Sequence, residues 1–494
     1  MNNMQNLVIF EMANNHQGDV DHALKIVEVY ADLCKKYDFD GAIKLQFRDI
    51  PNFISKKQLK TKTNKHIDRF LSTNLTQEKF KIICNSIKEK NLKLIITPFD
   101  EKSVDNAVKQ NVDILKIASC SASDWPLIEK IVSKKIDVIA STGGQNLENI
   151  DKLHSFLFHK NINFALMHCV SLYPTNIEEA NLGFLYKLKL RYSNTMIGYS
   201  GHEKPDDLTT IACAVGSGAK IFERHVGLET DEIKLNGYSM NPKQCDKWLD
   251  TLNQSIKAIK GNNVKNMTNK ELDSIQDLAR GVFAKNNIKK GNKITNKDVY
   301  YAFPLESNQL SSGQFSNDMI ATKNYKIDEK IYENLKIKQS VIIREFVHIY
   351  KGMFEEAKVT VGNYLNMELS HHYGIEYFRE YGAILITIIN NNYCKKLVGL
   401  LKCQKHPCHR HLKKNETFHV LYGDVKLIRN GIEHVLTKGD KIEIRAGDWH
   451  SFSSNEGAIF EEISSKSIVG DSQYKDKNIN KFDPYERKSE IILW

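Results

Sequence analysis

Short apolar runs alternate with amphipathic stretches through the first half of the chain. Eight such runs, each five to eight residues long, occur between residues 5 and 226. They are Leu7–Glu11, Ala42–Gln46, Leu92–Phe99, Ile114–Ser119, Val138–Gly143, Phe164–Ser171, Met196–His202 and Ile221–Val226. Runs of this length bounded by turn residues are typical of β-strands. Most of them are separated by stretches with a helical period, such as residues 21–33, 76–89, 146–158 and 206–215.

Eight strand–helix units in succession predict an α/β fold, a closed (β/α)8 TIM barrel over residues 1–262. A doubly wound open sheet is the alternative, because the same alternation of strands and helices builds both folds. The stretch Pro51–Asn74 is longer than a βα connection requires. We expect it to extend over the mouth of the barrel.

The middle of the chain changes character after a predicted helix at residues 241–259. The polar passage Gly261–Ser274 shows little periodicity, which indicates a linker. Residues 279–337 then contain two similar phrases, Ile288–Ile294 and Tyr325–Ile331, each with a turn between short β-like segments. We expect a small domain over residues 276–338, which needs support from a neighbour because its core is small.

Alternating strand patterns dominate from about Ser340 onward. The predicted strands are 383–389, 396–401, 416–422, 425–429, 440–444 and 459–463. Turns are predicted at Gly423-Asp424, Asn430-Gly431 and Gly439-Asp440. This spacing predicts an all-β barrel or jelly roll over residues 341–494, with a polar tail of about 30 residues wrapping its surface.

Composition limits the class of protein. The chain is 41% hydrophobic and 26% charged, as in ordinary soluble proteins, and no stretch reaches the roughly 18 uninterrupted apolar residues of a membrane span. Nine cysteines scattered through apolar runs, with no secretory leader pattern, indicate reduced thiols and a cytoplasmic protein. The net charge of +10 favours an anionic small substrate. The lysines are not clustered with aromatic residues, so we expect no nucleic-acid partner.

Two predicted strands that are neighbours in the chain each carry a histidine at the C-terminal end, His202 and His225. Imidazoles borne on neighbouring parallel strands converge at the mouth of the sheet, and histidine is a common ligand of divalent metals. The pair therefore predicts a metal site. Histidines hydrogen-bonded within the core are the alternative.

The other strand ends are also polar. Lys44 and Gln46 share one face of their strand by the two-residue period, so both are expected to point into the barrel. The further candidates are Glu11, Thr97, Lys116, Ser119 and Ser141. A buried lysine without compensation costs several kcal/mol, so two lysines near hydroxyls indicate that an anion completes the site. An ion pair with Glu11 or Asp100 is the alternative for either lysine.

Nine ordered motifs in this region resemble the sialic acid synthase family. They are Phe10–Gly18, Lys44–Gln46, Thr97–Asp100, Lys116–Ser119, Ser141–Gly143, His168-Cys169, Tyr173–Thr175, Gly198–His202 and Glu223–His225. The resemblance implies a transferase that condenses phosphoenolpyruvate (PEP) with a sugar aldehyde to give a nonulosonic acid. Residues 279–337 are similar to the antifreeze-like (SAF) domain that follows the barrel in this family. This implies a homodimer in which each SAF domain caps the partner's barrel.

The resemblance also implies roles for single residues. His202 and His225 match the ligands of a divalent metal, usually Mn²⁺ or Mg²⁺, and Glu11 matches an acid/base carboxylate. The positions that match PEP contacts are Lys44, Thr97, Lys116, Ser119, Ser141 and Ser200. Gln46 and Tyr173 match groups that line the sugar.

Several positions depart from the family's pattern. Ser121 replaces an acidic residue, Ser171 replaces an asparagine, and residues 233–237, which include Asn236, replace a Pro-Gly-Pro-Asp loop. Phe303-Pro304 stands where the SAF domain usually has Arg-Pro. We expect Ser121, Ser171 and Asn236 to face the sugar, so the PEP and metal half of the site is retained while the acceptor half is rebuilt.

The C-terminal region carries a second candidate metal site. His409 and His411 share one strand face, and Glu416 and His450 follow across turns. This spacing resembles the two cupin motifs, and residues 465–488 are similar to tails of sugar-isomerase-type cupins. Three imidazoles and one carboxylate suit Mn, Fe, Zn or Ni. A vestigial cupin, with histidines bonded internally, is the alternative.

Three functions are therefore open. The first is a metal-dependent PEP–sugar synthase with a cupin that isomerises, epimerises or binds the sugar. The second is a sugar isomerase or epimerase that works through the cupin alone, with an inactive barrel. The third is a sugar-binding protein without turnover. The sequence does not identify the acceptor sugar or either metal.

Overall fold

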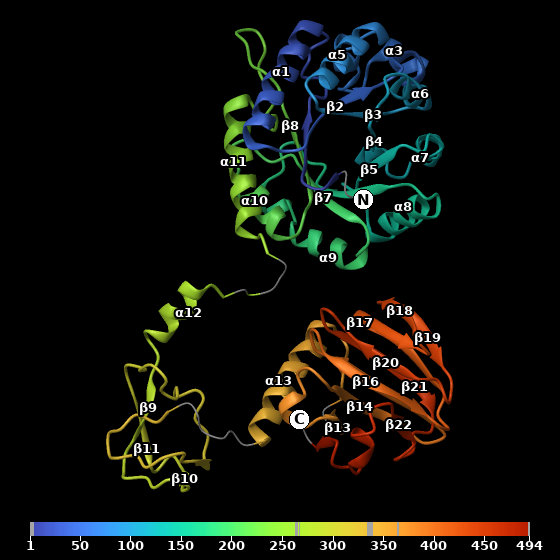
Figure 1. Cartoon of the computed structure of the whole chain (residues 1–494). Coiled ribbons are helices and arrows are strands. Elements are labelled where there is room, and N and C mark those ends of the chain that lie inside the picture. The colour runs from blue at the N-terminus through green and yellow to red at the C-terminus, as the bar shows by residue number, and fades with distance from the viewer. Residues whose placement is uncertain (1–3, 262–264, 266, 333–338, 363–364, 493–494) are drawn as a thin grey trace. The chain divides into compact units, whose positions relative to one another are not determined.

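The computed structural model describes residues 4–261, 265, 267–332, 339–362 and 365–492. The chain forms two compact units, residues 1–264 and 265–494 (Figure 1). Among the described residues, none of the helices has the length and apolar character needed to cross a membrane.

The first unit is a closed barrel of parallel strands (Figure 1). All eight predicted apolar runs form strands: β1 (Leu7–Glu11), β2 (Gly41–Phe47), β3 (Lys93–Pro98), β4 (Ile114–Ile117), β5 (Asp137–Ser141), β6 (Phe164–Cys169), β7 (Met196–Gly201) and β8 (Ile221–His225). Strand β8 pairs with β1, with Glu11 opposite His225. This closure confirms the TIM barrel, and the open-sheet alternative is wrong.

Helices follow the strands and surround them. Those of the barrel are α1 (Val20–Tyr37), α5 (Gln77–Glu89), α6 (Glu101–Lys109), α7 (Trp125–Val132), α8 (Leu147–His159), α9 (Gly183–Arg191), α10 (Thr209–Gly216) and α11 (Pro242–Ala258). Side-chain caps fix where several of them begin, because the first backbone N–H groups of a helix lack partners within it. Asp19, Thr76 and Asn241 accept such N–H groups at the starts of α1, α5 and α11.

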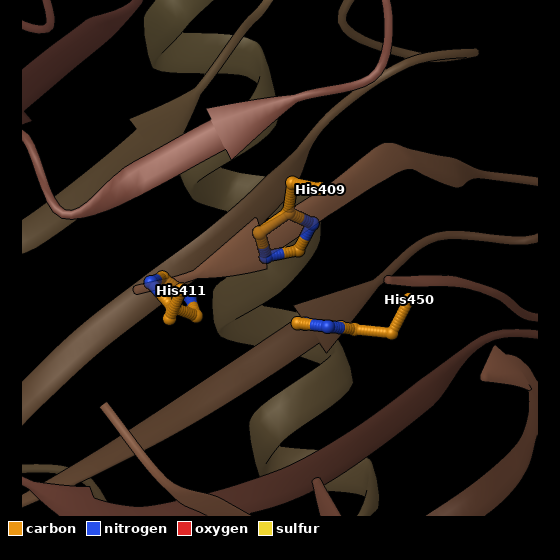
Figure 2. A group of neighbouring side chains, drawn as sticks. All are labelled: His409, His411 and His450. Carbon is orange, nitrogen blue, oxygen red and sulfur yellow. The ribbon is translucent and has the colours of Figure 1, made fainter. Parts of the chain in front are cut away.

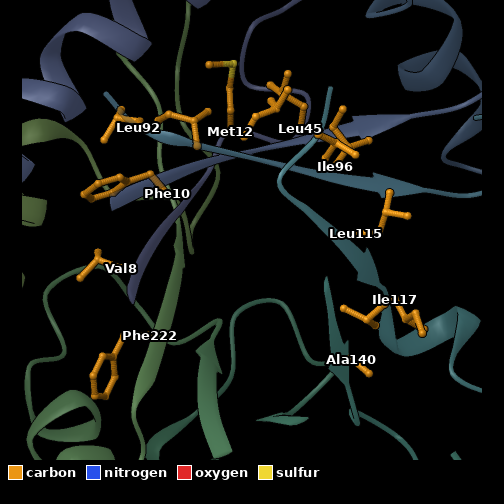
Figure 3. Close-up of a cluster of buried hydrophobic side chains, with 14 of the residues drawn as sticks. Val8, Phe10, Met12, Leu45, Leu92, Ile96, Leu115, Ile117, Ala140 and Phe222 are labelled. Carbon is orange, nitrogen blue, oxygen red and sulfur yellow. The ribbon is translucent and has the colours of Figure 1, made fainter. Parts of the chain in front are cut away.

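The two-residue period of the strands separates two packing layers. Outward-facing side chains such as Phe10, Leu45 and Phe222 belong to the cluster that packs against the helices (Figure 3). A second apolar cluster lines the barrel interior and consists mainly of Leu7, Ile9, Ala42, Ile95, Ile114, Ile139, Ala165, Met167 and Ile221. The next inward position along most strands is polar, so polar groups gather at the C-terminal end of the barrel.

The long connection after β2 folds into three short helices, α2 (Ile50–Phe53), α3 (Lys56–Thr61) and α4 (Ile67–Ser72). Ile50, Ile54 and Ile67 form its own small apolar cluster. Its Ile50 and Phe70 line a small cavity together with Gln46, at the C-terminal end of β2. The extension therefore lies beside the barrel mouth.

The second unit begins with a helix inside the predicted linker. Residues Asn269–Gln276 form α12, and the Thr268 side chain accepts the backbone N–H of Glu271 at its start. The prediction of a linker through Ser274 is therefore wrong in its second half. A capping threonine and an amphipathic turn supply enough local signal for a short helix.

The small domain after α12 contains β9 (Gly281–Ala284), β10 (Lys293–Ile294), β11 (Val299–Ala302) and β12 (Met319–Ile320). Its two similar phrases lie side by side, because Ile288 and Tyr325 exchange backbone N–H···O bonds of 2.9 and 2.8 Å. A compact apolar cluster that includes Val282, Ile294 and Ile331 fills it. Residues 333–338, the predicted end of this domain, lie outside the described residues.

A helix that was not predicted opens the C-terminal region. Helix α13 (Gln339–Glu356) buries Phe346, Val347, Tyr350 and Phe354, spaced as one helical face. These side chains share an apolar cluster with residues of the strands that follow. The alternating pattern begins only at β13 (Met367–Ser370), so the region starts with a helix that covers the sheet.

The remaining strands form an extended antiparallel sheet consistent with a cupin (Figure 1). They are β14 (Ala383–Asn390), β15 (Tyr393–Leu400), β16 (Lys405–His411), β17 (Glu416–Arg429), β18 (Ile432–Thr437), β19 (Lys441–Ile444), β20 (His450–Ser453), β21 (Ala458–Ser465), β22 (Ser472–Tyr474) and β23 (Lys488–Ile491). The turns predicted at Asn430-Gly431 and Gly439-Asp440 connect β17 to β18 and β18 to β19.

Two predictions for this sheet are wrong. Gly423-Asp424 is not a turn, because β17 continues through it with Gly423 at φ +72° and a register shift between Val420 and Tyr422. A glycine at positive φ with such a shift bends a strand without ending it. The polar tail is also part of the sheet, since β22 pairs with β16 and β23 pairs with β13.

Candidate active site and metal centre

A buried carboxylate, Glu223, lies at the centre of the polar end of the barrel. Its Oε1 is 3.1 Å from Lys44 Nζ and accepts a hydrogen bond of 2.9 Å from Ser200 Oγ. Its Oε2 is 2.8 Å from Lys116 Nζ. Both lysines are buried with it. Sequence reasoning assigned no role to Glu223, although the two-residue period from His225 places it on the same inward face.

Carboxylates of the protein itself pair with the buried lysines. Lys44 also forms an ion pair with Glu11, as one alternative from the sequence had it. Asp100 instead accepts the N–H of Ser103 at the start of α6. The lysines are thus compensated within the protein, so their burial alone does not require a bound anion, as the sequence had suggested.

Burial and neighbouring charges shift the pKa values of this cluster in opposite directions. Burial alone would raise the pKa of Glu223, but the charges of Lys116 and Lys44 outweigh it and hold that pKa well below its usual range. Burial lowers the pKa of Lys44 to about 8, against the attraction of Glu223 and with the repulsion of Lys116. Lys44 is therefore a cation whose charge titrates near physiological pH.

Glu11 is held by a chain of polar contacts that reaches the helical extension. Gln46 Nε2 donates to Glu11 Oε1 at 3.1 Å, and Arg48 Nη2 donates to Gln46 Oε1 at 2.8 Å. The Arg48 guanidinium lies 3.9 and 4.2 Å from the ring centres of Phe99 and Phe70. These contacts fix the orientation of Gln46. Sequence reasoning missed Arg48, which follows the Lys44–Gln46 motif by two positions.

His202 and His225 meet at the strand ends, with ring centres 5.3 Å apart. His202 Nδ1 donates to the carbonyl of Val170 at 2.9 Å, so its Nε2 carries the lone pair. Burial lowers the pKa of both histidines, which keeps the imidazoles neutral and competent as ligands. The pair therefore fits a divalent cation whose remaining positions stay open.

Two tyrosines flank this pair. Tyr173 lies 4.4 Å from the His202 ring, and Tyr238 lies 5.0 Å from the His225 ring. Tyr238 was not identified from the sequence. Asn236 Oδ1 accepts the backbone N–H groups of Tyr238 and Ser239, so the side-chain oxygen of Asn236 shapes the turn that presents Tyr238.

The remaining predicted residues lie at the same end of the barrel. Thr97, Ser121 and Ser141 are buried, and the Thr97 hydroxyl has no hydrogen-bond partner among the described residues. Ser119 Oγ accepts the Gly143 N–H at 3.1 Å. A Cβ at Gly143 would come within 2.5 Å of Ser171 Oγ and 2.8 Å of Ser119 Oγ, so Gly143 leaves room for both hydroxyls. Their roles in binding stay predictions.

Three histidines of the second unit converge. His409 and His411 come from β16 and His450 from β20, and their ligand atoms lie within 4.8 Å of one another (Figure 2). His409 Nδ1 and His450 Nδ1 donate to the carbonyls of Pro407 and Asp448, each at 3.1 Å. Both Nε2 atoms therefore carry lone pairs. Burial keeps the pKa of His409 well below its usual value and lowers that of His411 to about 4.

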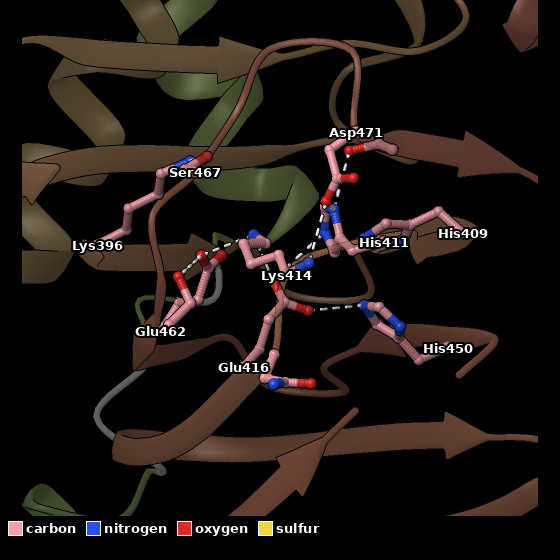
Figure 4. Close-up of polar contacts among 12 residues, drawn as sticks. Lys396, His409, His411, Lys414, Glu416, His450, Glu462, Ser467 and Asp471 are labelled. Atoms are coloured by element: carbon pink, nitrogen blue, oxygen red, sulfur yellow. Dashed lines mark hydrogen bonds and ion pairs between the residues drawn. The ribbon is translucent and has the colours of Figure 1, made fainter. Parts of the chain in front are cut away.

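Glu416 lies beside the three histidines and adds a carboxylate to the donor set. Its Oε2 lies 3.3 Å from His450 Nε2, and its Oε1 lies 3.3 Å from His411 Nε2 (Figure 4). Glu416 Oε2 and His450 Nε2 are both buried without a hydrogen-bond partner among the described residues, and a cation between them would satisfy both atoms. The donor set therefore fits a transition metal. Sequence reasoning missed Lys414, whose Nζ lies 2.5 Å from Glu416 Oε1 and 2.9 Å from Glu462 Oε1.

The barrel carries a lysine–glutamate cluster and a histidine pair, and it is joined to a cupin. The chain therefore has two modules, and comparison with known proteins finds both of them. The NeuB family matches residues 34–265, and the cupin domain family matches residues 397–461. The N,N'-diacetyllegionaminic acid synthase of Campylobacter jejuni is 30% identical over 344 residues, which cover 66% of this chain and 99% of that relative.

Solved structures extend this likeness. The spore coat polysaccharide biosynthesis protein E of Chromobacterium violaceum is 37% identical with a TM-score of 0.65, covering 67% of this chain and 100% of its own. The N-acetylneuraminic acid synthetase of Leptospira borgpetersenii, solved with citrate, is 27% identical with a TM-score of 0.50, covering 56% and 91%. The chain therefore belongs to the NeuB family. It is a transferase of the class that forms carbon–carbon bonds from PEP.

Proposed function

We propose that the barrel condenses PEP with a sugar aldehyde, an N-acylated hexosamine or a related sugar, to give a nonulosonic acid and phosphate. The observation that carries this proposal is the grouping of Lys44, Lys116 and Glu11 beside the His202–His225 pair. All lie at the end of the barrel where β/α enzymes place their chemistry. Relatives named as synthases of legionaminic, pseudaminic and N-acetylneuraminic acid derivatives support the product class.

In this proposal the lysines hold the anionic substrate. Lys44 and Lys116 exchange part of their pairing with Glu223 for the phosphate and carboxylate of PEP, at little cost because the cations are already desolvated. The hydroxyls that assist them are those of Thr97, Ser119, Ser141 and Ser200. The Thr97 hydroxyl supports this role, since it is buried without a partner among the described residues.

Glu11 is the proposed acid/base, oriented by Gln46. His202 and His225 would hold Mn²⁺ or Mg²⁺, which supplies Lewis-acid polarisation of the aldehyde oxygen. Tyr173 and Gln46 line the acceptor together with Ser121, Ser171 and Asn236. The last three depart from the family's pattern, which favours an acceptor other than N-acetylmannosamine.

The cupin is proposed to act on the sugar itself. His409, His411 and His450, with Glu416, would hold Mn, Fe, Zn or Ni and isomerise, epimerise or bind the acceptor. Such a fusion raises the local concentration of the acceptor without altering the barrel's chemistry. We further propose a cytoplasmic homodimer in which the SAF domain, with Phe303-Pro304, caps the partner's barrel.

The decisive experiment measures phosphate release from PEP with a panel of sugar aldehydes. His202→Ala and His225→Ala should each lower the rate at least about 100-fold, equivalent to about 2.7 kcal/mol of transition-state stabilisation. His159→Ala is the matched control, because His159 is exposed at the C-terminal end of α8. Normal turnover in both variants without a bound divalent ion would contradict the proposal.

A second candidate is a sugar isomerase or epimerase in which only the cupin is active, which the ordered histidine triad favours. It predicts aldose–ketose interconversion without PEP and no phosphate release with any sugar. If neither reaction occurs while sugar binds, the chain is a binding protein.

A further inference from the structure

Two adjoining cavities lie in the cupin domain. The inner one, about 120 Å³, is lined by His409, His411 and Glu416. The outer one, about 390 Å³, shares Lys396 and Tyr474 with it. The shared lining lets one ligand contact the metal-binding histidines and also fill the outer cavity.

Three cations line the outer cavity, and two of them, Lys396 and Arg487, form no ion pair among the described residues, although the charge of Glu462 also acts on Lys396 at longer range. Lys488, which also lines it, is paired with Glu368 and Glu490 at 3.2 and 2.8 Å. Lys396 instead donates only to the Ser467 hydroxyl, at 3.4 Å, within the described part of the chain (Figure 4). Arg487 has no ion pair among the described residues, and its Nη1 is buried without a hydrogen-bond partner there. An unmatched buried donor on a cation is costly unless a ligand satisfies it.

Arg487 lies close to the metal-binding histidines. Its guanidinium is 4.9 Å from the Tyr474 ring centre, and the Tyr474 ring is 5.5 Å from the His409 ring. One aromatic ring therefore separates the unmatched cation from the metal ligands. A sugar-sized molecule can span this separation.

The same cavity also offers a hydrogen-bond acceptor. His406 Nδ1 lies 3.2 Å from the Pro407 carbonyl and must donate to it, so His406 Nε2 is an acceptor. His372 Nε2 lies 3.0 Å from His406 Nε2 and 3.2 Å from the Ser370 hydroxyl, so it must be the donor between the two rings. This leaves His372 Nδ1 with a bare lone pair, buried and without a partner among the described residues. The free lone pair suits a ligand hydroxyl.

We propose that Lys396 and Arg487 bind the carboxylate or phosphate of an anionic sugar, while His372 accepts one of its hydroxyls and its far end reaches the histidine triad. This inference rests on the proposed role of the cupin in handling a sugar, and it names the ligand class. The cupin thus takes a sugar acid or a sugar phosphate rather than a neutral sugar.

The test is calorimetric titration of the full-length protein with three probes. N-acetylneuraminic acid supplies a carboxylate, mannose 6-phosphate supplies a phosphate, and N-acetylmannosamine is neutral. Arg487→Met and Lys396→Met should each weaken binding of at least one anionic probe about tenfold or more, because a charged hydrogen bond contributes at least that factor. Binding of the neutral probe should change less than about twofold in these variants. The probe that responds identifies the anionic group.

Lys402→Met is the matched control, since Lys402 is an exposed cation of the same domain, paired with Glu456. A barrel site for the same probe would appear as a component that neither cupin substitution changes. Wild-type binding of both anionic probes by R487M and K396M would overturn the inference, as would the absence of any anionic component that depends on these residues. Phosphate release from PEP, measured in parallel, reports on the synthase proposal separately. Thermal denaturation shows that each variant is folded, and K396M carries the test if R487M is not.

Discussion

Glu223 allows two lysines to lie inside the barrel. Moving a lone ammonium group out of water costs several kcal/mol, and a carboxylate between Lys44 and Lys116 offsets that cost. The same arrangement keeps both cations desolvated. In the proposed synthase, the phosphate and carboxylate of PEP would replace part of their pairing with Glu223.

Replacing Glu223 with Gln should destabilise the protein. Both lysines would lose their shared carboxylate while remaining buried, and breaking a buried pair in this way typically costs about 3–5 kcal/mol. Urea unfolding at pH 7 checks the loss. Exposed Glu232→Gln, in a loop of the same unit, is the control and should change stability by less than about 0.5 kcal/mol. Equal stability of the two variants would show that the lysines are not charged in the folded barrel.

The activity should decline on the alkaline side as Lys44 loses its proton. Its pKa is lowered to about 8, so kcat/KM for PEP should fall above that pH while KM for the sugar changes little. In Lys44→Arg the decline should move to higher pH, because a guanidinium remains charged.

The lowered pKa of Lys44 also makes the stability of the fold depend on pH. Between about pH 8 and 10.5 the unfolded chain binds more protons at this residue, so Lys44 by itself makes stability rise with pH.

Lys36→Arg is the control for this profile, because Lys36 is exposed and pairs with Asp246 on the outside of the barrel. Its variant should keep the wild-type decline. Coincident profiles for the wild type and Lys44→Arg would remove Lys44 from the PEP site.

At the scale of elements, the strand ends decide which residues meet. Strands β2, β7 and β8 are consecutive in space with β1, so Lys44, Ser200 and Glu223 converge although they are far apart in the sequence. In the cupin, β16 and β20 pair with His409 opposite His450. Register between neighbouring strands, rather than distance along the chain, therefore brings both histidine pairs together.

The bend of β17 at Gly423 should tolerate no side chain. Gly423 has φ +72°, and a Cβ there would lie 1.9 Å from the carbonyl oxygen of Gly457. Gly423→Ala should therefore lower the free energy of unfolding by more than about 3 kcal/mol, from both the clash and the backbone strain. Gly431→Ala is the matched control, because Gly431 has φ +85° and open space around it. It should cost about 1–2 kcal/mol, from the strain alone. Thermal denaturation of the full chain gives both values, and equal losses would show that β17 shifts to make room.

At the scale of the whole molecule, the chain has several separate apolar cores. Among the described residues, the barrel clusters end at Leu252 and Ile256, the small domain has its own cluster, and α13 packs with the cupin strands. Each domain thus has an apolar core of its own. Domains built in this way usually fold independently.

A chain ending at residue 338 should remain a soluble synthase. It keeps the barrel and the small domain and removes α13 with the whole cupin core. With PEP and the sugar aldehyde that the full chain accepts, phosphate release should persist at a rate within about threefold of that of the full chain, since no barrel residue is altered. The full-length His409→Ala/His411→Ala variant is the control and should likewise keep condensation while losing any conversion of a precursor sugar. Loss of condensation with every sugar, in variants still folded by circular dichroism, would show that the cupin contributes to the synthase site.

The sequence by itself determined the succession of domains and the position of most reactive groups. Alternation of apolar and polar residues is a local property, so the eight barrel strands and most cupin strands could be predicted within a few residues. The ordered motifs placed His202, His225, Lys44 and Lys116 at strand ends for the same reason. The unpredicted helix α13 and the continuous β17 show where local signals were missed or overruled by pairing in the sheet.

Only the tertiary structure decided which charges neutralise one another. Glu223 between the two lysines, Lys414 on Glu462, and Tyr238 beside His225 all depend on strand register and loop path. The same is true of the unmatched Arg487, which lies beside Tyr474 although it comes from the segment before β23, the strand that pairs with β13. The physical reason is that electrostatic energy depends on distances in space and on burial. These are set by contacts between residues remote in sequence, which no local pattern encodes.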